Sequence, residues 1–160
     1  MSMSLTIEKT TPAEAPMALF LLADPFEAKV RSYLDVSECF VARLGTKIVG
    51  VCSVIQRRPR VYELMNIAID SDDQQRGYGS ALLKWVIAYY REKGARQLEV
   101  GTGSFGYQLT FYQRYGFRVT SIERDFFVSN YPEPILEEGI QLRDMLRLTL
   151  LLIGGSAPNA

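Results

Sequence analysis

The sequence contains no histidine, and this absence removes a large part of enzyme chemistry. A Ser-His-Asp triad, a Cys-His pair and a histidine-ligated metal site all need an imidazole ring. Most hydrolase mechanisms are therefore excluded, and we expect no metal.

Cysteine, net charge and long apolar runs are also scarce. Cys39 and Cys52 lie in apolar segments without C-x-x-C spacing, which predicts small buried residues in a reducing compartment. Eighteen basic residues balance eighteen acidic ones, so no global field favours nucleic acid or an anionic membrane. Residues 17–23 are too few to span a bilayer, and no signal segment precedes them. We expect a cytoplasmic protein without nucleic-acid or membrane partners.

The apolar residues that are present suffice for one folded domain. The chain has 160 residues, of which 48% are hydrophobic, so we expect a single domain over residues 1–153 and a disordered tail over residues 154–160. Apolar alternation predicts strands at residues 5–9, 38–44, 47–56, 61–70, 97–101, 117–128 and 141–151. Start signals and helical spacing predict helices at residues 11–23, 25–34, about 78–93 and 107–115.

This order of elements predicts an α/β (α+β) fold. We expect one mixed, mostly antiparallel sheet of six or seven strands with helices on both faces.

A glycine-rich segment joins the apolar run at residues 64–69 to the amphipathic helix that follows it. Gly77 and Gly79 lie in this turn, where the missing Cβ lets a ligand approach the backbone N–H groups. The first N–H groups of a helix have no internal partner, and the helix dipole adds partial positive charge there. The turn therefore suits a phosphate or a pyrophosphate, and Arg76 adds a full charge.

The pattern of residues around the glycines narrows the type of phosphate site. A P-loop would need Lys-Ser or Lys-Thr after the glycines, and a dinucleotide fingerprint would need a glycine at Leu82. Residues 74–79, Gln-Gln-Arg-Gly-Tyr-Gly, instead resemble the Gln/Arg-x-x-Gly-x-Gly/Ala pattern of the GCN5-related N-acetyltransferases, the GNAT family. Residues 111–117, Phe-Tyr-Gln-Arg-Tyr-Gly-Phe, resemble the Phe-Tyr-x-x-x-Gly-Phe segment that ends the next helix in that family. The similarity covers at least residues 61–118.

The resemblance implies the GNAT fold and acetyl-CoA as co-substrate. It implies that the loop holds the pyrophosphate, and that the fourth and fifth strands are parallel and splay apart to admit the pantetheine arm. Ser104 stands where relatives often have an asparagine, and its hydroxyl could bond pantetheine. The expected cofactor-binding residues are Ile67, Ala68, Ile69, Gln74, Gln75, Arg76, Gly77, Tyr78, Gly79, Ser80 and Ser104.

Acetyl transfer to an amine needs a neutral nucleophile, a stabilised oxyanion and a proton for the departing thiolate. Glu63 lies close to where the family places a carboxylate that deprotonates the acceptor through water, although Met65 stands nearer to the usual position. The alternative for Glu63 is an ordinary exposed acid. Tyr112 corresponds to the tyrosine that returns a proton to the CoA sulfur, and a phenol of pKa near 10 can do so. The alternative for Tyr112 is a core aromatic.

The sequence thus predicts an acetyl-CoA-dependent N-acetyltransferase that acts by direct transfer on a primary amine of a small molecule or peptide. A non-catalytic acyl-CoA-binding sensor on the same fold is the alternative. Arg57, Arg58 and Arg60 could meet an acidic acceptor or the CoA 3′-phosphate, or form a solvated turn.

The residues leave the acceptor and the oligomeric state open. Phe126, Phe127 and Tyr131 could line an apolar acceptor pocket or only close the core. A homodimer is also open, with residues 146–153 as a strand that would pair across the interface.

Overall fold

The computed structural model describes residues 4–152, and the predicted tail at residues 154–160 lies outside them. The chain divides into two compact units, the first ending at Ala95 and the second beginning at Arg96. The single domain expected over residues 1–153 therefore stays a prediction.

Four antiparallel strands form the sheet of the first unit, in the order β1-β2-β3-β4. They are β1 (Leu5–Thr10), β2 (Glu38–Leu44), β3 (Lys47–Arg58) and β4 (Val61–Ile69). The turn between β2 and β3 contains Gly45 at φ 60°, a conformation that favours glycine. These strands match the predicted ones to within two residues at each end.

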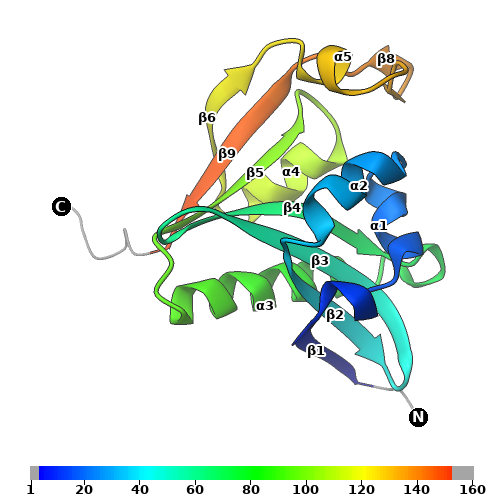
Figure 1. The fold of residues 1–160 in the computed structure, drawn as a ribbon, viewed down its shortest axis with the longest axis vertical. Helices are drawn as coiled ribbons and strands as arrows, with labels where there is room; N and C mark the ends of the chain where they lie inside the picture. Colours follow the sequence, from blue (N-terminus) through cyan, green and yellow to red (C-terminus); the bar gives the residue numbers. More distant parts are fainter. Residues whose placement is uncertain (1–3, 153–160) are drawn as a thin grey trace. The chain divides into compact units, whose positions relative to one another are not determined.

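Helices cover both faces of this sheet (Figure 1). On one face, α1 (Met17–Ala23) and α2 (Glu27–Leu34) bury a core that includes Phe20, Val30 and Cys39. On the other face lies α3 (Tyr78–Glu92), whose aromatic side chains surround the ring of Phe40. Cys39 and Cys52 are both buried free thiols, as predicted.

The predicted single helix at residues 11–23 is wrong, because a proline divides it. A short 3-10 helix, η1 (Pro12–Glu14), is followed by Ala15 in the extended conformation, and α1 begins only after Pro16. A residue that precedes proline avoids the α region, which accounts for the break. Thr11, at the N-terminus of η1, makes no side-chain cap hydrogen bond, and Glu14 accepts one from the hydroxyl of Thr10 at 2.9 Å.

The second unit contains three antiparallel strands in the order β5-β9-β6. They are β5 (Gln97–Gly103), β6 (Arg118–Glu123) and β9 (Met145–Leu151), and α4 (Tyr107–Arg114) follows β5. A short helix, α5 (Phe126–Asn130), and a small hairpin of β7 (Leu136–Glu137) and β8 (Ile140–Gln141) connect β6 to β9.

In this unit one predicted strand ends early, and the possible pairing of the last strand with another chain is contradicted. The predicted strand at residues 117–128 stops at Glu123, because Asp125 adopts a left-handed φ of 60°, donates its N–H to Asp144 Oδ1 at 2.8 Å, and starts α5. The last strand does not offer an edge to another chain. β9 pairs with β5 on one side and β6 on the other, so both of its edges are occupied within the unit.

Antiparallel strands interleaved with helices confirm the α/β (α+β) class. The predicted parallel arrangement of β4 and β5 involves strands of different units and stays a prediction. Within residues 4–152 no helix is long and apolar enough to cross a bilayer.

Candidate active site

A bulge interrupts β4 at Met65. Leu64 lies opposite Val54 of β3, but Asn66 lies opposite Ser53, so Met65 is the extra residue. Side chains alternate between the faces of a strand, and an extra residue shifts that alternation by one. Glu63 and Asn66, three residues apart, therefore face the same side of the sheet, the side covered by α1 and α2.

Glu63 is buried, with 4% of its surface exposed, so its alternative interpretation as an exposed acid is wrong. The Nε atom of Arg57 donates a hydrogen bond to Glu63 Oε1 at 2.6 Å. Arg60 donates to the carbonyl of Gly94 at 3.0 Å, where α3 has ended. The turn expected at Arg57, Arg58 and Arg60 is shorter, because β3 continues through Arg58. Arg57 and Arg60 both bind groups of their own unit.

Asn66 forms a buried polar contact that the sequence analysis missed. Its Nδ2 atom donates to the carbonyl of Phe20 at 3.0 Å and to the hydroxyl of Tyr33 at 3.0 Å. Burial raises the pKa of Tyr33 to about 12, against the opposing effect of the Asn66 hydrogen bond. The sequence signal for this contact was a single asparagine in the otherwise apolar stretch from Leu64 to Ile69, because a buried amide requires hydrogen-bond partners.

The glycine-rich turn opens α3 as predicted. Gly77 is the N-terminal cap, with φ 82°, and its carbonyl accepts the N–H of Ala81 at 3.0 Å. A Cβ at Gly77 would meet no atom within 4 Å, so the backbone conformation accounts for glycine there. Gly77 has no side chain that could cap the first N–H groups of α3, and a helix start of this kind suits a ligand.

Side chains on both sides anchor this loop to the sheet. Gln74 Nε2 donates to the carbonyl of Ile69 at 2.9 Å, which joins two of the predicted cofactor-binding residues. Just before it, the short 3-10 helix η2 (Ser71–Asp73) ends in a buried carboxylate. Lys47, the first residue of β3, binds this Asp73 at 2.8 Å, and the same hydrogen bond raises the pKa of Lys47. Arg76 is exposed in the loop.

The remaining predicted residues belong to the second unit. Tyr112 is only 3% exposed, and its ring meets Phe111 and Phe117 edge-on at centroid distances of 5.2 and 5.4 Å. Ser104 is exposed after β5. Glu63 and Tyr112 lie in different units, so their joint action stays a prediction.

The aromatic residues of the β6–β9 connection contact one another. Phe127 meets Phe126 edge-on at 5.3 Å and stacks on Tyr131 at 6.0 Å. All three are half-buried.

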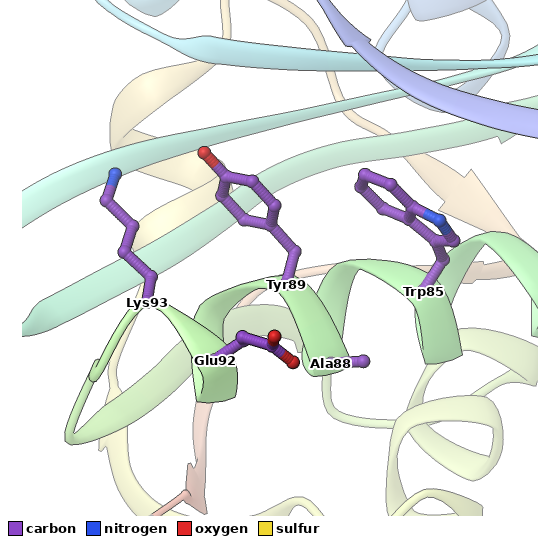
Figure 2. A pocket seen from close by; sticks show the side chains of 5 residues that line it. All are labelled: Trp85, Ala88, Tyr89, Glu92 and Lys93. Atoms are coloured by element: carbon purple, nitrogen blue, oxygen red, sulfur yellow. The ribbon is translucent and has the colours of Figure 1, made fainter.

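A groove of about 500 Å³ lies elsewhere, along the C-terminal half of α3. Its lining contains none of the predicted site residues and consists of Trp85, Ala88, Tyr89, Glu92 and Lys93. Figure 2 shows the rings of Trp85 and Tyr89 and the amine of Lys93 extending from the same side of the helix.

A cluster of charged side chains around Glu38 lies next to this groove. The carboxylate accepts hydrogen bonds from Tyr90 at 2.5 Å, Lys9 at 2.9 Å and Lys93 at 3.0 Å. Burial would raise the pKa of Glu38, but these three hydrogen bonds lower it to about 2. The cluster joins β1, β2 and α3, so we assign it a role in stabilising the fold of the first unit.

Comparison with known proteins identifies the family. The family model of the acetyltransferase (GNAT) domain matches residues 35–119. YvbK of Bacillus subtilis strain 168, described as an uncharacterized N-acetyltransferase, is 42% identical over 133 residues, which cover 82% of this chain and 86% of that protein. The chain belongs to the GNAT acetyltransferase family. It is therefore an acyltransferase, as predicted.

Solved structures confirm the GNAT fold. This GNAT protein superposes on a GNAT family acetyltransferase from Elizabethkingia anophelis with acetyl-CoA bound, with a TM-score of 0.86 and 39% identity over 92% of this chain and 97% of that one. An IAA acetyltransferase from Bacillus cereus ATCC 14579 gives a TM-score of 0.87 and 39% identity over 92% and 99%. The described part of the chain shows no group of three or more acidic or cysteine side chains placed to hold a metal.

Proposed function

We propose that this GNAT protein transfers the acetyl group of acetyl-CoA directly to a primary amine of a small molecule or peptide. The start of α3 carries the proposal, because Gly77 has a left-handed φ there, has no side chain to cap the first N–H groups, and follows a loop that Gln74 ties to the end of β4. Such a helix start favours a pyrophosphate, and the exposed Arg76 adds charge for it. The relative from Elizabethkingia anophelis, solved with acetyl-CoA, supports the same ligand here.

The expected roles of the residues follow from the proton balance of the reaction. Bound acetyl-CoA would supply an activated thioester. The amine nitrogen forms a bond to the acetyl carbon and the carbon–sulfur bond breaks, so one proton leaves the nitrogen and one reaches the sulfur. In our proposal Glu63 accepts the first through water and Tyr112 donates the second.

The position of Glu63 supports this role. It is buried on the face of β4 covered by α1 and α2, and Arg57 fixes one of its carboxylate oxygens at 2.6 Å. A base held in one orientation loses less entropy when it meets the acceptor. Gln74 to Ser80 would hold the pyrophosphate, with Ile67 to Ile69 and Ser104 along the pantetheine arm.

The test is a thiol-release assay with acetyl-CoA and a panel of polyamines, amino acids, aminoglycosides, aryl amines and N-terminal peptides. Calorimetric titration with CoA is run alongside it. Turnover with one class of amine supports the proposal and gives the acceptor class.

The same pair of measurements distinguishes the alternative function. CoA binding without turnover on any amine would favour the acyl-CoA sensor. Absence of CoA binding would contradict both functions and the assignment of the loop.

A further inference from the structure

Two buried polar atoms of the first unit have no hydrogen-bond partner among residues 4–152. They are the hydroxyl oxygen of Ser53 and the amide oxygen of Asn66. Ser53 is 0% exposed and Asn66 is 4% exposed, so bulk water does not reach them. A buried polar atom without a partner costs about 1 to 3 kcal/mol, which points to a partner that is not a side chain.

The two atoms share one place in the fold. Ser53 and Asn66 are directly opposite each other on β3 and β4, beside the bulge at Met65. Opposed residues of an antiparallel pair project from the same face, with Cβ atoms about 4.5–5.5 Å apart. On β3, Ser53 alternates with Val51 and Ile55, which belong to the core beneath α1 and α2.

The chemistry of the two groups specifies the occupant. The Nδ2 atom of Asn66 already donates to Phe20 and Tyr33, so its Oδ1 atom can only accept. The Ser53 hydroxyl can donate or accept. A single water can donate to Asn66 Oδ1 and bond Ser53 Oγ at the same time, and buried waters in proteins join groups of this kind.

We propose that Ser53 and Asn66 bind one ordered internal water, and that this water fixes the orientation of the Asn66 amide. With Oδ1 held by the water, Nδ2 points to the carbonyl of Phe20 in α1 and to the hydroxyl of Tyr33 on α2. Asn66 then joins both helices to β4, and the water extends this buried network to Ser53.

A crystal structure of the unmodified protein at a resolution that orders internal water tests the site directly. We expect one water within about 3 Å of both Ser53 Oγ and Asn66 Oδ1. A dry space between the two residues, or a direct hydrogen bond between them, would overturn the proposal.

The variant Ser53→Ala tests the effect on the helices. We expect loss of the water and exchange of the α1 and α2 amide hydrogens about fivefold faster, the factor that corresponds to one net hydrogen bond. Unchanged exchange in these helices would overturn the role of the water in fixing Asn66.

Cys52→Ala is the matched control. Cys52 immediately precedes Ser53 on β3, is 0% exposed, and faces α3 by alternation. This variant should keep the water and leave α1 and α2 at their original rates. Neither measurement needs a substrate, so the result is independent of the proposed acetyl transfer.

Discussion

At the scale of single residues, Glu63 and Asn66 illustrate what a sequence can and cannot predict. The sequence placed Glu63 on the correct strand, because strand alternation is local. It could not predict that Glu63 is buried, since this depends on Arg57 and on an extra residue in β4. Asn66 was missed for the same reason, because its partners Phe20 and Tyr33 lie 46 and 33 residues away.

Glu63→Gln tests the proposed base. We expect kcat to fall about 100-fold, the usual contribution of a general base, while CoA affinity stays nearly unchanged because Glu63 is outside the loop. Thiol release and calorimetry measure the two quantities. Glu8→Gln is the control, since Glu8 is also a strand carboxylate paired with an arginine, Arg43, at 3.5 Å. An unchanged kcat in Glu63→Gln would refute the role of the carboxylate as a base.

Tyr112→Phe separates the proposed proton donor from a core aromatic. The ring contacts with Phe111 and Phe117 survive this change, so stability should vary little while kcat falls by about 10-fold or more. Steady-state rates and a thermal melt are the measurements. Tyr115→Phe serves as the control, because Tyr115 also packs edge-on against Phe111, at 5.7 Å. If Tyr112→Phe keeps its full rate, Tyr112 is a packing residue.

At the scale of elements, α3 and its loop were predictable from the sequence. The break before α1 and the early end of β6 were not. A glycine turn, an apolar repeat and a terminal Gly94 are contiguous in the sequence, and each has a local physical cause. The start of α5 depends on Asp125, whose N–H is bound by Asp144, 19 residues away. Local alternation around Phe126 therefore favoured a strand where the structure has a helix.

Gly77→Ala tests the loop as an element. A Cβ at φ 82° is strained by about 1 kcal/mol, and relief of this strain would rotate the first N–H groups of α3. We expect CoA affinity to fall about 10-fold, the factor that 1.4 kcal/mol of lost binding produces. Calorimetry measures this directly.

Gly94→Ala provides the matched control at the other end of the same helix. Gly94 has φ 88° and, like Gly77, open space around its Cβ position. The two variants should lose similar stability, and only Gly77→Ala should lose CoA affinity. Equal losses of affinity would mean that the loop has no special part in binding.

At the scale of the whole molecule, the family could be predicted from two motifs because both are short and continuous. The hydrogen-bond network around Glu38, which joins β1, β2 and α3 of the first unit, could not be predicted from the sequence. Glu38 is separated from Lys9, Tyr90 and Lys93 by 29, 52 and 55 residues. Such contacts become evident only when the chain is folded.

The low pKa of Glu38 predicts how the stability of the fold depends on pH. Its pKa of about 2 in the folded protein lies below the ordinary value of 4.5, so its contribution is complete above pH 4.5 and is lost as the pH falls toward 2. We expect a loss on the order of 2 kcal/mol, a figure that allows for the 26% exposure of the side chain.

Chemical denaturation between pH 5 and about pH 2.5 measures this effect, over the window that the two pKa values define. In Glu38→Gln the side chain no longer titrates, so the free energy of unfolding should change less over this interval than in the unmodified protein. Identical pH dependence in the two proteins would contradict the assigned role of the cluster.

The two buried cysteines also determine how the protein behaves toward thiol reagents. Burial raises the pKa of Cys39 to about 11 and that of Cys52 further, so neither forms an appreciable thiolate at neutral pH. An aromatic disulfide reagent added to the folded enzyme would therefore report liberated CoA without background from the polypeptide. For the same reason, a cysteine introduced on the surface would be the one reactive position for a fluorophore or spin label.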